Sequence, residues 1–235
     1  MITPPQLLNR LNFLGTSTLG VAGVLVYTFR IGPHHLRITH RPMPLAGLPS
    51  PWIGKRLVHI SDFHIGPAVN DTYLKKTFLK IGALEPDIIC FTGDFMTCQG
   101  NEEVRHSLEV LHHLKPAKIA TLGIPGNHDY ASGWSRKDVA DELVEGINKQ
   151  GTFEMLRNQA LDIDGLTFYG FDDLWAKQFD NRILKNQRDE AAIALTHNPD
   201  TADAEGWTDY QGWILAGHTH GGQCKPPFLP PPLLP

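Results

Sequence analysis

Two histidines near the end of the patterned part of the chain could bind a metal ion together. His218 and His220 stand two residues apart in the sequence Gly-His-Thr-His-Gly-Gly, directly after the short apolar run 213–216. Imidazoles at this spacing on a turn can direct ring nitrogens into one small volume, and the neighbouring glycines let the backbone come close to a ligand. A histidine pair does not complete a metal site, so further donors must come from elsewhere in the chain.

Further donors follow four other short apolar runs, each of which is typical of a buried strand that ends in a turn. The runs are 57–60, 88–91, 119–122 and 193–196, and the donors after them are Asp62 and His64, Asp94, Asn127 with His128 and Asp129, and His197. Because these strands alternate with helices, the pattern predicts an α/β fold, in which ligands bind beyond the carboxyl ends of the strands. We therefore expect these side chains to meet at one place.

The donor types restrict the metal. Carboxylate, amide oxygen and imidazole, without a thiolate, suit Mn²⁺, Fe or Zn²⁺ better than a cysteine-rich structural zinc site. The strand ends carry eight such residues, and seven candidate ligands are already too many for one ion. They are Asp62, His64, Asp94, Asn127, His128, His197, His218 and His220. They suit two ions that share a carboxylate, and a single-metal structural site is the alternative.

The elements that must position these donors can be placed from apolar periodicity. Helices are predicted from Asn70 or Asp71 to residue 84, over 102–114 and over 135–149. After Gly151 short strands dominate, over 153–156, 160–163 and 166–171, and a short helix is predicted over 199–205. The first strand, 57–60, is expected to be buried with His59 inside it.

Composition excludes several classes of function. The chain has 235 residues and a net charge of −4, so no basic field indicates a specific nucleic-acid partner. Cys90 is expected to be a buried, reduced thiol, since the three cysteines form no paired motif. No Ser-His-Asp order, Walker loop or dinucleotide-binding glycine motif occurs, which leaves a serine enzyme or a nucleotide kinase without support.

The N-terminal region predicts a membrane anchor. Residues 11–29 carry no charge and lie between Arg10 and Arg30, although polar residues and glycines make this a marginal span. A signal-peptide core and a helix docked on the domain are the alternatives. Further arginines follow the segment, which favours a cytoplasmic location for what comes after it, and this basic stretch could contact anionic headgroups. We expect residues 1–54 to form the anchor and a proline-rich linker, and residues 55–235 to form the catalytic domain.

At this point the chain resembles a known family, the calcineurin-like metallophosphoesterases, over residues 57–223. The motifs that carry the resemblance are Asp62-Phe-His64, Gly93-Asp94, Gly126-Asn127-His128-Asp129, His197 and Gly217-His218-Thr-His220. Details around them are similar to the bacterial YaeI/YkuE-like branch of small phosphodiesterases with an N-terminal anchor. The resemblance implies a four-layer αββα sandwich and a location at the bacterial inner membrane, with the catalytic domain on the cytoplasmic side. A soluble cytoplasmic or an exported protein is the alternative.

The resemblance also implies roles for the residues. Asp62, His64 and His220 would hold one metal ion, Asn127, His197 and His218 the other, and Asp94 would bridge them. Two divalent ions about 3.5–4 Å apart produce a bridging hydroxide that can attack phosphorus. His128 would face the phosphate and stabilise charge or protonate the leaving oxygen. Asp129 would orient the His128 imidazole or raise its pKa, unless it serves only as a turn residue.

The predicted function is therefore dinuclear, metal-dependent hydrolysis of phosphodiester or pyrophosphate bonds, with Mn²⁺ as the expected metal. The substrate is expected to be lipid-linked if the anchor holds the site near a bilayer. One alternative is the UDP-2,3-diacylglucosamine pyrophosphatase reaction of lipid A synthesis, and another is a non-catalytic binding module. The chain ends twelve residues after Gln223, where members of this branch continue, so we expect either a fragment or a sandwich that lacks its C-terminal strands. No motif in residues 133–189 identifies the substrate.

Overall fold

The computed structural model describes residues 18, 20, 22–24, 26–27, 36–97, 100–186, 191–207 and 210–220. The chain divides into two compact units, residues 1–42 and 43–235. In the first unit, the described positions between 18 and 26 are helical. Across the described residues, no helix combines the length and apolar character that a membrane span requires. Most of the predicted anchor, 11–29, lies outside the described residues, as does the C-terminal segment 221–235.

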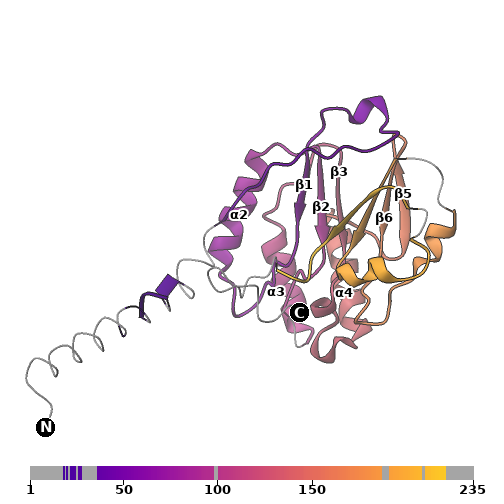
Figure 1. The fold of residues 1–235 in the computed structure, drawn as a ribbon. Helices are drawn as coiled ribbons and strands as arrows, with labels where there is room; N and C mark the ends of the chain where they lie inside the picture. The colour runs from indigo at the N-terminus through magenta and orange to yellow at the C-terminus, as the bar shows by residue number, and fades with distance from the viewer. Residues whose placement is uncertain are drawn as a thin grey trace, which may run out of the picture. The chain divides into compact units, whose positions relative to one another are not determined.

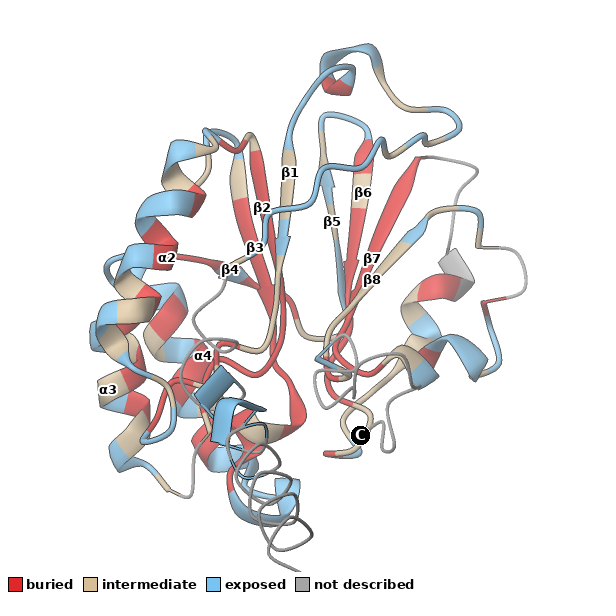
Figure 2. Ribbon diagram, turned by 60° about the vertical axis from the view of Figure 1, so that its left-hand side comes forward, coloured by how far each residue is buried: buried red, intermediate tan, exposed pale blue. Residues whose placement is uncertain are grey.

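The second unit contains two four-stranded sheets (Figure 1). The first sheet is parallel throughout, and its strands lie in chain order. They are β1 (Leu57–Ile60), β2 (Ile88–Thr92), β3 (Ala120–Ile124) and β4 (Glu154–Met155). Three helices follow the first three strands and cover one face of this sheet (Figure 2). They are α2 (Asp71–Ala83), α3 (Glu102–Leu111) and α4 (Lys137–Gln150).

The second sheet is mixed. Its first pair of strands is antiparallel and the other two pairs are parallel. The strands, again in chain order, are β5 (Gln159–Ile163), β6 (Leu166–Gly170), β7 (Ala192–Thr196) and β8 (Trp213–Ala216). Two 3₁₀ helices in the same part of the chain are η6 (Asn181–Asn186) and η7 (Pro199–Asp203). The short helix predicted over 199–205 is therefore present, in 3₁₀ form.

Apolar side chains fill the space between the two sheets. Leu122 and Ile124 of β3 pack there with Phe168 of β6 and Leu195 of β7, and all four are buried. A second core joins the first sheet to its helices, and a third lies around Phe171 and Trp207. The α/β sandwich predicted from the sequence is confirmed. Among the described residues its outermost layer, beyond the second sheet, is built from 3₁₀ helices and loops rather than from α-helices.

Local sequence signals explain where the helices begin and end. The Asn70 side chain accepts hydrogen bonds from the amides of Thr72 and Tyr73, so it caps α2 as predicted. Gly151 follows α4 in the left-handed conformation that ends helices.

One expectation for the strands is wrong. His59 is exposed, because β1 is an edge strand of its sheet.

The segment that we expected to be a linker, 42–54, packs on the domain. Trp52 is 6% exposed, its ring lies edge-on against Phe168, and its Nε1 donates a hydrogen bond to the Ile163 carbonyl at 3.0 Å. Met43 and Leu45 pack against the same core. The segment forms the short 3₁₀ helix η3 (Ser50–Trp52), and its apolar side chains pack against the core between the two sheets. The folded unit therefore begins near residue 43.

Candidate metal centre

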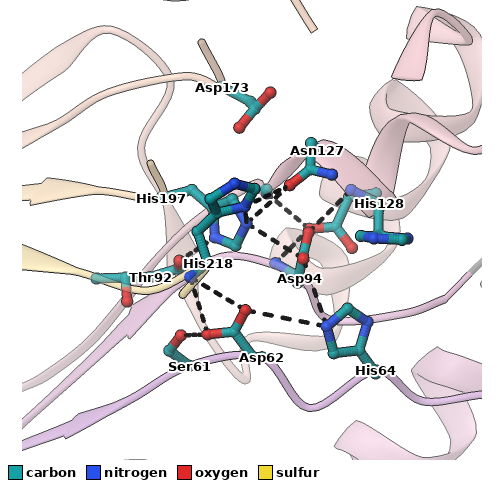
Figure 3. Close-up of polar contacts among 12 residues, drawn as sticks. Ser61, Asp62, His64, Thr92, Asp94, Asn127, His128, Asp173, His197 and His218 are labelled. Carbon is teal, nitrogen blue, oxygen red and sulfur yellow. Dashed lines mark hydrogen bonds and ion pairs between the residues drawn. The ribbon is translucent and has the colours of Figure 1, made fainter. Parts of the chain in front are cut away.

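The predicted donors come together at the carboxyl ends of strands from both sheets (Figure 3). Those after β1, β2 and β3 come from the first sheet, and those after β7 and β8 come from the second. The two sheets approach at this end, where the amide of His218 donates to the Asp62 carboxylate at 3.1 Å and His197 Nδ1 donates to the carbonyl of Thr92 at 2.7 Å. The site therefore depends on the packing of one sheet against the other.

Three side chains form what we call the outer group, namely Asp62, His64 and His220. His64 Nε2 lies 3.1 Å from His220 Nε2 and 3.9 Å from Asp62 Oδ1. His220 Nε2 lies 3.5 Å from the same carboxylate oxygen. The two imidazoles are stacked, with ring centroids 4.9 Å apart. One atom of each residue therefore faces a common point.

Three other side chains form what we call the buried group, namely Asn127, His197 and His218. Asn127 Oδ1 lies 3.0 Å from His197 Nε2 and 3.1 Å from His218 Nδ1, and these two nitrogens are 3.3 Å apart. All three residues are buried. The three atoms form a nearly equilateral triangle, which is the arrangement that three ligands of one ion adopt.

Asp94 lies between the two groups. Its Oδ2 is 3.1 Å from His197 Nε2 in the buried group and 3.5 Å from His64 Nε2 in the outer group. Its Oδ1 accepts a hydrogen bond from the amide of His128 at 2.9 Å, which fixes the carboxylate. A single oxygen atom is thus within ligand spacing of both groups.

These spacings fit metal binding. Nitrogen and oxygen ligands about 2.1 Å from an ion stand about 3.0–3.4 Å from each other in tetrahedral or octahedral geometry. The separations in the buried group and from Asp94 to His197 lie in or next to this interval. Those in the outer group extend to 3.9 Å. The donor set is imidazole, carboxylate and amide oxygen, which suits a hard or borderline divalent ion.

Two of the imidazoles are held in orientation by contacts of their other nitrogen. His197 Nδ1 donates to the backbone carbonyl of Thr92 at 2.7 Å, and His64 Nδ1 is 2.6 Å from Thr97 Oγ1. Each contact leaves Nε2 facing the cluster. Hydrogen bonds made by the nitrogen that faces away from the metal fix the tautomer and the ring plane of metal-binding histidines.

The backbone of the ligand loops is strained. Five of the seven donor residues have a positive φ, which is uncommon outside glycine and concentrates at functional sites. They are Asp62, His64, Asp94, His218 and His220. Glycines allow the loops to meet. A Cβ on Gly126 would overlap Asp94 Oδ1, and one on Gly217 would overlap Ser61 Oγ and lie 2.8 Å from Asp62 Oδ2.

Burial and neighbouring charges shift the pKa values of the side chains in the cluster. Burial raises the pKa of Asp62 to about 6, against the opposing effect of His197. Burial also opposes ionisation of Asp94, but His197 and His64 outweigh it and hold the Asp94 pKa below its usual value. Burial lowers the pKa of His64 and of His218 to about 4, so both rings are held as neutral, electron-pair-donating imidazoles.

The two predicted catalytic residues occupy different places. The His128 ring is half-buried, and it lies edge-on to His64 with centroids 4.9 Å apart. The Asp129 carboxylate is fully buried and accepts hydrogen bonds from the amides of Gly126, Asp94 and Met96. Within the described part of the chain no hydrogen bond joins Asp129 to the His128 ring. We expected Asp129 either to act on that ring or to serve as a turn residue, and its hydrogen bonds go to the loops after β2 and β3.

The loop after β6 contributes residues that we did not expect at the site. Asp173 is fully buried, and among the described residues one of its carboxylate oxygens has no hydrogen-bond partner. It interacts electrostatically with His197, and Figure 3 shows it beside the cluster. Trp175 contacts His218 edge-on, with ring centroids 4.2 Å apart. The same rule that located the other donors, polar residues directly after a strand, would have found the pair Asp172-Asp173.

Asp172 belongs to an ion-pair network that links this loop to the metal loops. Arg157 Nε lies 2.6 Å from Asp172 Oδ2, and Arg157 Nη2 lies 2.7 Å from the Tyr130 hydroxyl. The Tyr130 hydroxyl donates to Asp172 in turn, and Arg157 also pairs with Asp141 of α4. Tyr130 ends the 3₁₀ helix η4 (Asn127–Tyr130), which carries a donor of the buried group. The network therefore fixes that donor against the second sheet.

A two-sheet α/β sandwich with a cluster of histidine, carboxylate and amide donors at its strand ends is the architecture of a metal-dependent hydrolase. Comparison with known families identifies which one. The family model of the calcineurin-like phosphoesterases matches residues 55–222. This chain therefore belongs to the calcineurin-like metallophosphoesterases, a metal-dependent family, and is a hydrolase that acts on phosphoric ester bonds.

Individual relatives agree with this assignment. UDP-2,3-diacylglucosamine pyrophosphatase LpxG of Chlamydia trachomatis is 30% identical over 263 residues, covering 90% of this chain and 78% of the relative. Its counterpart in Chlamydia muridarum is 27% identical and covers 86% and 74%. The uncharacterized metallophosphoesterase YkuE of Bacillus subtilis is 28% identical and covers 94% and 78%. The resemblance seen in the motifs thus extends over most of the chain.

Proposed function

We propose that this chain hydrolyses phosphodiester or pyrophosphate bonds with two divalent metal ions. The observation that carries the proposal is the position of Asp94 Oδ2, 3.1 Å from His197 Nε2 and 3.5 Å from His64 Nε2. An oxygen between two groups of donors is what a dinuclear centre requires. One ion alone would leave one of the two groups without a role.

In this proposal each group holds one ion and Asp94 belongs to both. The outer ion is held by Asp62, His64 and His220, and the buried ion by Asn127, His197 and His218. Manganese suits this mixture of imidazole and oxygen donors, with iron and zinc as the alternatives. When bound, two such ions lower the pKa of a water molecule and take up charge on the phosphoryl oxygens.

His128 is the residue that we propose to act on the substrate directly. Its ring lies against the outer group at His64 and is half-buried, so a substrate can reach it. A protonated ring nitrogen there would donate its proton to the leaving oxygen or hold the phosphoryl group by a hydrogen bond. No other donor is needed in that role.

For Asp129 we propose a positioning role. Its carboxylate binds amides of Gly126, Asp94 and Met96, so it joins the loop after β2 to the loop after β3. The first loop carries Asp94, which both groups share, and the second carries Asn127, which belongs to the buried group. Asp129 then acts through the geometry of Asp94 rather than through the proton of His128.

The proposal is tested by metal content and turnover of the full chain. Protein stripped with a chelator and reloaded with Mn²⁺ is expected to hold two equivalents by elemental analysis. It should hydrolyse bis-p-nitrophenyl phosphate only when loaded. A single tightly bound equivalent with full activity would contradict the dinuclear centre, and metal binding without any turnover would contradict the hydrolytic role of this cluster.

A more specific candidate is the UDP-2,3-diacylglucosamine pyrophosphatase reaction. The similarity to LpxG over 90% of the chain favours it. We further propose that residues 11–29 anchor the chain at the bacterial inner membrane, with the catalytic unit on the cytoplasmic side. The full chain is then expected to cut this lipid-linked pyrophosphate faster than a version that starts at Met43, where the folded unit begins.

Soluble aryl phosphodiesters supply the control for that experiment. Both versions should hydrolyse them at the same rate, because every proposed ligand lies within 62–220. If both versions remain in the soluble fraction after cell lysis and neither prefers the lipid-linked substrate, the membrane proposal fails while the hydrolytic one stands.

A further inference from the structure

Two tryptophans from different loops lie against each other at the edge of the metal centre. Trp134 ends the 3₁₀ helix η5 (Ser132–Trp134), and Trp175 lies in the loop after β6. Their ring centroids are 4.8 Å apart and their planes are tilted by 39°. Trp134 is 37% exposed and Trp175 is half-buried. The pair, which we call the indole shelf, presents aromatic surface to solvent.

The indole shelf contacts one of the proposed metal ligands, His218. Trp175 lies edge-on against the His218 ring, with centroids 4.2 Å apart and an angle of 82° between the planes. Trp134 follows His128 closely in the same segment of chain. A substrate whose phosphoryl group lies between His218 and His128 therefore has the shelf within reach of the group next to its phosphate.

The backbone around Trp134 is held in an uncommon conformation. Trp134 itself has a φ of 53°, and Ala131 has a φ of 57° with a ψ of −156°, a region that glycine normally occupies. Hydrogen bonds from the Trp134 amide to the Ala131 carbonyl and from the Arg136 amide to the Tyr130 carbonyl maintain it. Here the strained backbone positions an indole that lies outside the core. Such strain is typical of functional sites.

We propose that the indole shelf binds a nucleobase of the substrate, so that the preferred substrate is a phosphoester or pyrophosphate of a nucleotide. Indole faces stack on planar bases, whatever the base. The neighbours of Trp134 are the small, exposed residues Ser132, Gly133 and Ser135. The two serines offer hydroxyl groups to the edge of a base, and none of the three residues offers an aliphatic side chain to an acyl chain. This inference rests on the proposed hydrolytic function.

Two phosphate monoesters that differ only by a base test it. Uridine 5′-monophosphate and ribose 5-phosphate are compared as inhibitors of bis-p-nitrophenyl phosphate hydrolysis by the Mn²⁺-loaded full chain, from initial rates. The uridine compound is expected to inhibit about tenfold more strongly, the scale of one base–aromatic stack. It should also quench indole fluorescence, which ribose 5-phosphate should leave unchanged.

Three variants separate stacking from other effects. The ratio of the inhibition constants of ribose 5-phosphate and uridine 5′-monophosphate should fall close to one in Trp134→Leu. The inhibition by ribose 5-phosphate itself should not change. Trp134→Phe keeps an aromatic face and should retain most of the preference. The matched control is Trp213→Leu, since Trp213 is 39% exposed on β8, and it should leave the ratio unchanged.

The outcomes distinguish this inference from the proposed function. Equal inhibition by the two compounds in the wild-type protein overturns the shelf, as does an unchanged ratio in Trp134→Leu, while hydrolysis of the diester still supports the enzyme. No hydrolysis of any phosphodiester by the loaded wild-type protein overturns the proposed function, and the shelf with it.

Discussion

The outer and buried groups of donors offer the same kinds of atoms in different surroundings. The side chains of His220 and His64 are 34% and 15% exposed, whereas the side chain of His197 is fully buried. The orienting contacts differ too. His64 is held by the side chain of Thr97, and His197 by the main-chain carbonyl of Thr92.

This difference indicates a division of labour between the two groups. A buried ion held by side chains that the main chain and core fix in place is expected to exchange slowly. In the proposed centre the outer ion would lie on the solvent side, next to His128, where a substrate would arrive. The buried group then serves mainly to retain metal, and the outer group mainly to meet the substrate. Four substitutions can break or sharpen this comparison.

The largest effect is expected from Asp94→Asn, because Asp94 is shared by both groups. The amide keeps the shape but removes the negative charge that lets two dications lie side by side. We expect loss of at least one metal equivalent and of nearly all activity. This effect is larger than the 10–100-fold loss of metal affinity or activity that follows removal of a hydrogen bond that orients a ligand. Elemental analysis and turnover of bis-p-nitrophenyl phosphate measure both. Two retained metals with wild-type turnover would show that Asp94 does not bridge.

His128→Ala should separate chemistry from metal retention. Metal content should stay near two equivalents, while turnover falls by about 10²–10⁴-fold, the range for general acid–base catalysis. The loss should be smaller for esters with good leaving groups, such as p-nitrophenyl, than for alkyl esters. A loss that is the same for both would leave His128 as a phosphate-binding residue only.

Arg157→Met should loosen Asn127, the member of the buried group that comes from the first sheet, from the second sheet. The side chains of Arg157 and Asp172 are 19% and 4% exposed, so removing the cation leaves a buried carboxylate without its partner. We expect the free energy of unfolding to fall by about 3 kcal/mol, measured by denaturant titration. Arg182→Met is the matched control, because the Arg182 side chain is 78% exposed and its pair with Asp180 should contribute little to stability. Equal losses in both variants would argue against the network.

The smallest effect is expected from Thr97→Val, which removes the hydroxyl that orients His64. The affinity for one metal equivalent should fall by about 10–100-fold, and the other equivalent should bind as before. Turnover at saturating Mn²⁺ should stay close to wild type. Calorimetric titration of the chelator-stripped protein resolves the two equivalents. If Thr97→Val lowered the affinity of both metal equivalents equally, the two groups would not bind metal independently.

Much of the site could be predicted from the sequence, because its donors obey a local rule. Each stands directly after a short apolar run, and the carboxyl ends of such strands meet in α/β folds. The helix cap at Asn70 and the strand at 213–216 follow from similarly local signals. His59 shows the limit of such signals, because an edge strand and a central strand have the same apolar pattern while only their neighbours differ.

The sequence by itself determined which candidate donors follow the strands, their order and the class of chemistry, since residue types and their distance from strand ends are written in the chain. Only the tertiary structure decided that the donors are divided between two sheets, that one group is buried and the other open, and that Asp129 bonds to the loops of Asp94 and Asn127. It also decided that Trp134 meets Trp175. These contacts join segments far apart in the chain and depend on sheet packing and on positive-φ loop conformations, which no local periodicity specifies.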